Sequence, residues 1–185
     1  MDQYRVYGNP IKQSKSPFIH QQFAKQTAQT INYQSELVAH GQFEQTVRQF
    51  IHDGGKGANI TAPFKEEAMA LCDNLSERAK LAGAVNTLFF VDGEIYGDTT
   101  DGDGLVNDLL NNHIVLTNKR ILLLGAGGAA KGVVLPLLEQ NIAHLAIANR
   151  TVTKAQAIIN QYPKHSVSAC SFDEADSERF DIIIN

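Results

Sequence analysis

The sequence lacks the features that mark several large classes of protein. It has two cysteines, Cys72 and Cys170, which stand far apart without a Cys-x-x-Cys spacing, so we expect neither a disulfide framework nor a zinc site. Its six histidines show no metal-ligand spacing, and no metal is predicted. The net charge of -4 gives no electrostatic reason to expect nucleic acid or an anionic membrane as a partner.

Long hydrophobic runs are also absent. No apolar stretch approaches the roughly 20 residues that a transmembrane helix needs. The first residues, MDQYRVYGN, lack the basic and hydrophobic regions of a signal peptide, so a cytoplasmic location is expected. The composition that is present, 43% hydrophobic and 19% charged residues, is ordinary for a chain that buries a core. A length of 185 residues suits one large domain or two small ones.

Apolar strands and amphipathic helices alternate through the first half of the sequence. Ser16 before Pro17 is typical of a helix N-cap followed by the first helical position, whereas Ser14 has no helix to cap. Asp92-Gly93 predicts a tight hairpin. This half is therefore predicted to be α/β. The predicted strands cover residues 4–7, 32–38, 58–61, 86–91 and 94–97, and the predicted helices begin near residues 17, 43, 64 and 76.

The pattern changes near residue 100, after the polar segment GDTTDGDG. A helix is predicted over 104–110, followed by strands at 121–124 and 144–148 and helices after each of them. These strands are apolar throughout, which favours a parallel sheet covered on both faces. The last residues, FDIIIN, predict another such strand. Because a parallel sheet of this type usually continues through further strands, we expect the sequence to be a fragment.

A glycine-rich turn joins the strand at 121–124 to the helix that follows it. Glycines allow the backbone to turn sharply and to approach a pyrophosphate, while the helix N-terminus supplies free N–H donors. The alternative is a glycine-rich turn without a ligand. With a strand before it and a helix after it, the turn favours dinucleotide binding. The residues concerned are Gly125, Ala126, Gly127, Gly128 and Ala129.

The end of the next strand indicates which dinucleotide would bind. NAD-binding sites usually present a carboxylate there, but this strand ends in Asn149, Arg150 and Thr151, with Lys154 one turn further on. A guanidinium and an ammonium group suit the 2′-phosphate of NADP. Solvated charges at a helix start are the alternative, although cations are disfavoured at that position. The pattern favours NADP over NAD.

Polar residues also gather at the ends of the predicted strands in the first half. In an open α/β sheet, ligands bind beside such strand ends, and hydroxyl and amide groups suit a small polyhydroxylated molecule. Each residue taken alone is more often a cap or a turn residue than a ligand. The candidates are Ser14, Ser16, Asn59, Thr61, Lys65, Asn86 and Asp101.

The motifs GNPIKQSKSPFIH, GGKGANITAPFKEEA, LAGAVNTL, GDTTDGDG, LLGAGGAAKG and IANRT, in this order, closely resemble those of the shikimate dehydrogenases. The resemblance covers essentially the whole chain. It implies reversible reduction of 3-dehydroshikimate to shikimate by NADPH, a step of aromatic amino acid biosynthesis. It also implies that residues 1–100 form a substrate-binding, catalytic domain and that residues 101–185 form part of a Rossmann-like NADP-binding domain.

The same resemblance implies roles for individual residues. Ser14 and Ser16 would bind the substrate carboxylate, with Thr61 beside them. Lys65 and Asp101 would form the catalytic pair and, with Asn86, face the ring hydroxyls. Asn59 would belong to the same group of substrate-binding residues. Glu77 matches a position sometimes assigned to cofactor binding, and the alternative is that it is an ordinary carboxylate on a helix surface. The cofactor residues would be Gly125, Ala126, Gly127, Gly128 and Ala129 at the pyrophosphate and Asn149, Arg150, Thr151 and Lys154 at the 2′-phosphate.

The sequence departs from the family pattern in three ways. Thr99 stands where many members have Asn, and Ala62 stands where Val is commoner. Family members are also longer, and the additional part normally completes the nucleotide sheet and adds residues to the substrate site. Two alternatives therefore stay open, a quinate/shikimate dehydrogenase of the same fold and a fragment that binds substrate without turnover. The oligomeric state is left open as well.

Overall fold

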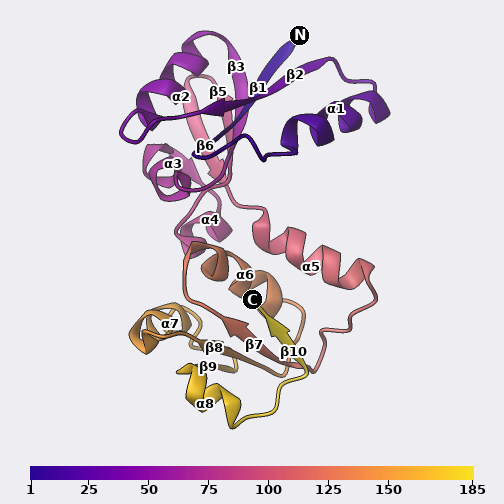
Figure 1. Ribbon diagram of the computed structural model, residues 1–185, viewed down its shortest axis with the longest axis vertical. Helices are drawn as coiled ribbons and strands as arrows, with labels where there is room; N and C mark the ends of the chain where they lie inside the picture. The colour runs from indigo at the N-terminus through magenta and orange to yellow at the C-terminus, as the bar shows by residue number, and fades with distance from the viewer. The chain divides into compact units, whose positions relative to one another are not determined.

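A computed structural model describes residues 1–185, and the chain divides into two compact units, Met1–Thr99 and Thr100–Asn185. The first unit contains β1 (Asp2–Gly8), α1 (Ser16–Gln26), β2 (Ile31–Leu37), α2 (Phe43–His52), β3 (Gly55–Ile60), α3 (Lys65–Leu71), β4 (Asn74–Leu75), α4 (Glu77–Ala82), β5 (Thr87–Val91) and β6 (Glu94–Asp98). The second unit contains α5 (Asp101–Asn111), β7 (Arg120–Leu124), α6 (Gly128–Leu138), β8 (His144–Ala148), α7 (Val152–Ile159), β9 (Val167–Cys170), α8 (Phe172–Asp176) and β10 (Ile182–Ile184). The predicted α/β fold class is confirmed (Figure 1).

The first unit is built on a six-stranded mixed sheet with the order β2-β1-β3-β5-β6-β4. Strand β1 is parallel to β2 and β3, whereas β5 is antiparallel to both β3 and β6. Because β5 runs opposite to its neighbours, its amino end lies at the same edge as the carboxyl ends of β1, β2, β3 and β6. This edge is called the polar edge below.

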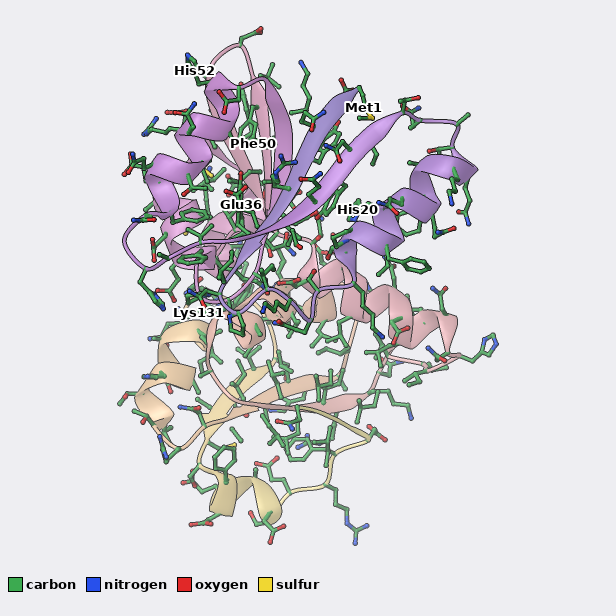
Figure 2. All side chains as sticks on the ribbon, turned by 45° about the horizontal axis from the view of Figure 1, so that its top comes forward. Met1, His20, Glu36, Phe50, His52 and Lys131 are labelled. Atoms are coloured by element: carbon green, nitrogen blue, oxygen red, sulfur yellow. The ribbon has the colours of Figure 1, made fainter.

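The sheet is covered on both faces because successive side chains of a strand point to opposite sides. Tyr7 belongs to the main core, which also contains the buried side chains of α2, α3 and α4. The neighbouring Val6 belongs to a second, smaller cluster with Tyr33 on the side of α1. Figure 2 shows Phe50 on the α2 side of the sheet and His20 on the α1 side. Successive side chains of β1 therefore contribute to the two cores on opposite faces of the sheet.

The predicted hairpin between β5 and β6 is present. Asp92 and Gly93 both have positive φ, 52° and 87°, which is the conformation that a two-residue hairpin turn of this kind requires. The predicted start of the next helix was wrong, because α5 begins at Asp101 instead of residue 104. Two acidic residues in its first turn, Asp101 and Asp103, suit the positive end of the helix dipole. Glycine is required at position 102, because a Cβ there would collide with the Gly132 carbonyl of α6.

The second unit has a four-stranded sheet with the order β10-β7-β8-β9, in which every pairing is parallel. Ile121 of β7 and Leu145 and Ile147 of β8 are fully buried. The uninterrupted apolar strands of the sequence thus correspond to strands buried on both faces, as predicted. None of the helices in the chain is both long enough and apolar enough to cross a membrane.

A carboxylate at the end of β6 ties that strand to α4. Asp98 accepts a hydrogen bond from Arg78 Nε at 2.7 Å, a second one from Arg78 Nη2, and a third from Ser76 Oγ at 2.5 Å. The hydrogen bonds from Arg78, more than any other interaction, lower the pKa of Asp98 from its ordinary value of 3.8 to about 2. Partial burial of the carboxylate acts in the opposite direction.

Replacing Phe64 by Ala tests the main core. Phe64 is fully buried and stacks on Phe43 with 5.1 Å between the ring centroids. We expect Phe64→Ala to lower the free energy of unfolding by about 3–5 kcal/mol, measured by urea denaturation. Phe18→Ala is the control, because Phe18 is 65% exposed, and we expect a change within about 0.5 kcal/mol. Similar losses in the two variants would contradict the assigned core.

The pH dependence of stability tests the Arg78–Asp98 pair. Because the folded-state pKa of Asp98 is depressed, its ionised form stabilises the fold fully above its ordinary pKa of 3.8, and this contribution is lost as the pH falls towards about 2. We expect Asp98→Asn to be less stable than the unmodified chain at neutral pH and to lose less stability over that acid range. The control is Asp92→Asn, the same chemical change at the hairpin turn. An equally steep acid loss in Asp98→Asn and the unmodified chain would count against this assignment.

Candidate active site

The polar candidates of the first unit lie along the polar edge of its sheet. Thr61 follows β3 directly, Lys65 begins α3, and Asn86 immediately precedes β5. The loop that holds Ser14 leaves β1 at Gly8. They gather here because parallel strands end at one edge and the reversed β5 begins at the same edge.

The two serines near the start of α1 differ from their predicted roles. Ser16 is the first residue of the helix and does not cap it. Ser14 does contact the helix start, because its Oγ accepts the Ser16 N–H at 3.3 Å. The reason is a turn closed by the Ser14 N–H and the Ile11 carbonyl at 3.0 Å. This turn leads the chain into the helix one residue earlier than the position of Pro17 indicated.

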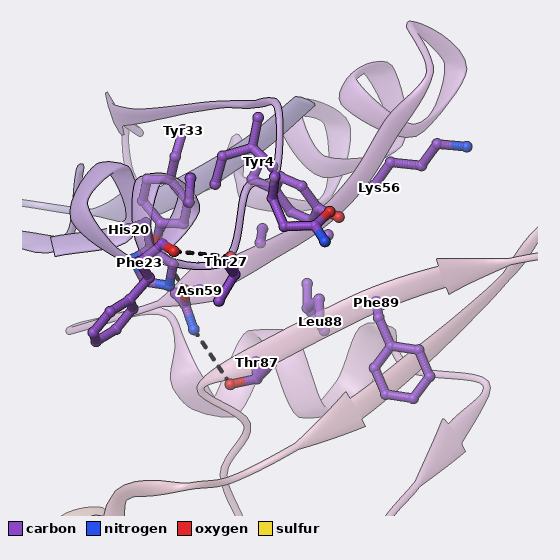
Figure 3. A pocket seen from close by; sticks show the side chains of 15 residues that line it. Tyr4, His20, Phe23, Thr27, Tyr33, Lys56, Asn59, Thr87, Leu88 and Phe89 are labelled. Atoms are coloured by element: carbon purple, nitrogen blue, oxygen red, sulfur yellow. Dashed lines mark hydrogen bonds between the residues drawn. The ribbon is translucent and has the colours of Figure 1, made fainter. Parts of the chain in front are cut away.

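A chain of side-chain hydrogen bonds crosses the sheet just inside the polar edge (Figure 3). Tyr33 of β2 donates a hydrogen bond to Asn59 Oδ1 at 2.7 Å. Asn59 Nδ2 in turn donates to the Asn86 carbonyl and to Thr87 Oγ1, each at 3.3 Å. The structure therefore links Tyr33, Asn59 and Asn86, which are far apart in the sequence.

Tyr33 was not among the predicted site residues. Tyr33 lies within the predicted strand 32–38, but nothing in the sequence indicated its partners. Burial raises the pKa of the Tyr33 phenol, which keeps it protonated and able to donate to Asn59. Its ring stacks on His20 of α1 with 4.0 Å between centroids, so Tyr33 also fixes α1 against the sheet.

Backbone hydrogen bonds hold Asn86 and Lys65 close to each other. Asn86 is only 8% exposed, its N–H donates to the Asp98 carbonyl at 3.0 Å, and its carbonyl accepts the Ile60 N–H at 2.7 Å. The preceding residue, Val85, donates its N–H to the Lys65 carbonyl at 2.9 Å. The first turn of α3, which carries Lys65, is thereby attached to the strand that Asn86 begins.

The remaining predicted site residues are Thr61 and Glu77 of the first unit and Asp101 of the second. Thr61 donates its N–H to the Tyr7 carbonyl at 2.9 Å, which places it at the end of β1. Glu77 is an exposed helix residue whose carboxylate pairs with Lys80 Nζ at 2.6 Å. Asp101 is the first residue of α5 and belongs to the second unit.

A cavity of about 470 Å³ opens beside α1, on the face of the sheet that carries Tyr33. Of the predicted site residues, only Asn59 lines it. Its walls include the aromatic side chains of Tyr4, His20, Phe23 and Phe89. The cavity is therefore largely apolar, and Ser14, Thr61, Lys65 and Asn86 lie outside its lining.

In the second unit, the glycine turn follows β7 and leads directly into α6. Gly125 has a φ of 104°, which disfavours any residue with a Cβ, and its N–H donates to the Ala148 carbonyl at 2.8 Å. A Cβ added at Gly127 or Gly128 would meet no atom within 4 Å. The first turn of α6 is thus approachable by a ligand, while Ala126 is buried and Ala129 is exposed. This geometry fits a bound pyrophosphate.

The end of β8 carries the residues predicted to select the dinucleotide. Asn149 Nδ2 donates to the Thr151 carbonyl at 2.8 Å and shapes the turn into α7, and Thr151 is the N-cap residue of that helix without a side-chain capping bond. Arg150 and Lys154 are exposed, and neither side chain has an ion-pair partner among the residues described. Two unpaired cations beside a helix N-terminus fit a bound phosphate.

Comparison with known proteins assigns both units to one family. Residues 6–88 match the family described as the shikimate dehydrogenase substrate binding domain, and residues 108–185 match the one described as shikimate / quinate 5-dehydrogenase. The NADP(+) shikimate dehydrogenase of Colwellia psychrerythraea is 55% identical over 184 residues. The match covers 100% of this chain and 67% of that relative, so the chain spans about two thirds of its length.

Solved structures agree with this assignment. An Ael1 enzyme from Pseudomonas putida has a TM-score of 0.95 and 43% identity, covering 99% of this chain and 68% of that one. The shikimate 5-dehydrogenase of Thermus thermophilus, solved in complex with NADP(H) and shikimate, has a TM-score of 0.81 and 30% identity, covering 87% of this chain and 60% of that one. The protein therefore belongs to the family of the NADP-dependent shikimate dehydrogenases.

Proposed function

We propose that this protein binds shikimate at the polar edge of its first unit and NADP at the glycine turn of its second, and that it interconverts shikimate and 3-dehydroshikimate. The observation that supports this most is the hydrogen-bonded chain from Tyr33 through Asn59 to the Asn86 carbonyl. It gathers at one sheet edge the residue types that a small polyhydroxylated acid requires.

The substrate carboxylate is assigned to the serine end of the polar edge, with Thr61 beside it. The Ser14 oxygen accepts the Ser16 N–H, which leaves its own O–H proton for the ligand. Ser14 can therefore donate to a carboxylate while its oxygen holds the start of α1. The ring hydroxyls are assigned to Asn86 and Lys65, which the backbone holds close together.

Lys65 is proposed as the proton donor in ketone reduction. Bound NADPH supplies the hydride, and negative charge then develops on the ketone oxygen. An ammonium group held within about 3 Å of that oxygen can protonate it. Asp101 is proposed as the carboxylate that favours and orients the ammonium form. Oxidation of shikimate requires the neutral amine instead, so that direction should gain from a rising pH.

Binding and turnover of the chain itself test the proposal directly. Titration calorimetry with shikimate and with NADPH, beside an assay of NADPH formation from shikimate and NADP, separates three results. Turnover supports the proposed function, and binding of both ligands without turnover reduces it to a binding module. Absence of binding for both ligands would overturn it.

A second candidate is oxidation of quinate, because the family matched by residues 108–185 is described by both substrates. Comparing quinate with shikimate, and NAD with NADP, in the same assay separates the two activities. A higher kcat/KM for quinate would favour the second candidate.

Replacement of Lys65 tests its role. We expect Lys65→Ala to lower kcat by about 100-fold or more with a smaller change in KM, as for loss of acid catalysis. Lys25→Ala, at an exposed lysine in the last turn of α1, is the control and should keep both constants. An unchanged kcat in Lys65→Ala would remove Lys65 from the catalytic role.

Replacement of Arg150 tests cofactor choice. Loss of charge-assisted hydrogen bonds worth about 1.5–3 kcal/mol should weaken NADP binding about 10- to 100-fold. NAD has no 2′-phosphate, so its affinity should stay the same in Arg150→Ala. Lys164→Ala removes an exposed cation elsewhere in the second unit and serves as the control. Calorimetry that gives equal losses for the two dinucleotides would count against the phosphate assignment.

A further inference from the structure

Arg78 and Asp98 have no role in the function proposed above, yet their contacts reach the polar edge. The Asp98 carboxylate accepts both Arg78 Nε and Arg78 Nη2, one on each oxygen. Oδ1 also accepts Ser76 Oγ at 2.5 Å and the Thr99 N–H at 2.8 Å. The carboxylate thus joins α4 to the backbone that leaves β6.

The backbone of Asp98 is bonded directly to a residue assigned to the substrate. Its carbonyl accepts the Asn86 N–H at 3.0 Å, and Asp98 lies opposite Thr87 in the antiparallel pairing of β5 and β6. Any rotation of the Asp98 peptide therefore moves the carbonyl that accepts the Asn86 N–H. Thr99, the next residue, is 5% exposed, so the chain is held on both sides of the Asp98 carboxylate.

The two-pronged contact fixes orientation as well as distance. A guanidinium that donates through two nitrogens to two carboxylate oxygens sets the plane of the carboxylate, which a lysine cannot do. Ser76 also links the carboxylate to α4. Its Oγ donates to Asp98 Oδ1 and accepts the Ala79 N–H, and so caps the helix. The first turn of α4 and the end of β6 are therefore locked as one piece.

The position of this pair separates it from an ordinary surface ion pair. The side chains of Arg78 and Asp98 are 36% and 22% exposed, and they join two different elements of the fold, α4 and β6. The pair of Arg48 and Glu44 on α2 has exposures of 60% and 66% and bonds within a single helix. It provides a natural control in the same unit.

We propose that Arg78 and Asp98 are positioning residues for the reaction. The Arg78 guanidinium orients the Asp98 carboxylate, and Asp98 in turn holds the Asn86 backbone and the start of the segment 99–101 that leads to Asp101. Neither side chain touches the substrate. This inference rests on the proposed function, since it concerns residues assigned to shikimate and to proton transfer.

Calorimetric titration of shikimate into variants of this chain tests the inference. We expect Arg78→Gln to weaken shikimate binding by about 10-fold, because small displacements of positioned groups are costly. Arg78→Lys should recover little of this loss, since it restores the charge without the fork. Arg48→Gln should bind as the unmodified chain does. Circular dichroism identifies a temperature at which every variant is folded, so that affinity and stability are separated.

A merely structural role predicts a different result. It would lower the unfolding temperature of Arg78→Gln while leaving the shikimate affinity of the folded protein unchanged, and that result would overturn the inference. If the unmodified chain itself does not bind shikimate, the proposed function fails and this inference falls with it. The two failures are distinguished by the first titration.

A second measurement needs no variant and covers the case in which Arg78→Gln does not fold. In the unmodified chain, the NMR signals of the Arg78 Nε–H and the Thr99 amide should shift on saturation with shikimate. The signal of the Arg48 Nε–H should stay in place. Arg78 and Thr99 signals that remain unmoved in a shikimate-saturated sample would overturn the inference.

Discussion

The reversal of β5 within an otherwise parallel neighbourhood is the constraint on which the polar edge depends. A strand parallel to β3 would begin at the opposite edge and carry Asn86 away from Thr61 and Lys65. Because β5 is antiparallel, its first residues meet the carboxyl ends of β1 and β3. The Asn86 carbonyl then accepts the Ile60 N–H, and Asn59 can reach across to it. A hairpin turn at Asp92 and Gly93 is sufficient to return the chain for β6.

The hydrogen bonds along the polar edge matter for stability because they involve buried polar groups. Tyr33 is 3% exposed, and an unsatisfied phenol at such a place would be costly. Asn59 satisfies it, and the remaining amide protons of Asn59 are satisfied by Asn86 and Thr87. The orientation of each group is therefore set by its hydrogen bonds to the neighbouring groups. Residues at the edge are held in place before any ligand arrives, which reduces the ordering that binding requires.

The features that could be predicted from the sequence are those decided by local chemistry. The turn at Gly125 requires a positive φ that glycine allows, and the strands around it are apolar because both their faces are buried. The start of α1 was misjudged because it depends on a turn from Ile11 to Ser14, which the Ser16-Pro17 pair does not encode. The short strands β4 and β9 and the short helix α8 were not predicted, because they lack the uninterrupted run of large apolar residues that indicated the similarly short β10.

Side-chain pairs between distant segments could not be predicted at all. Tyr33 and Asn59 are 26 residues apart, and Arg78 and Asp98 are 20 apart. A single sequence contains no signal that pairs them, because tyrosine, asparagine and arginine are each compatible with many surroundings. The resemblance to a family supplied candidate ligands, and the structure adds the residues that hold some of those ligands in position.

The two units present their candidate ligands in different ways. In the first, Asn59 and Asn86 are engaged with neighbouring strands, so that their orientation is a property of the fold. In the second, Arg150 and Lys154 project from a helix start without a partner, and the glycines beside α6 leave open space. An arrangement of oriented amides suits a small rigid ring that must be placed accurately for reaction. Free cations suit a phosphate at the far end of a long cofactor, where attraction is needed more than accuracy.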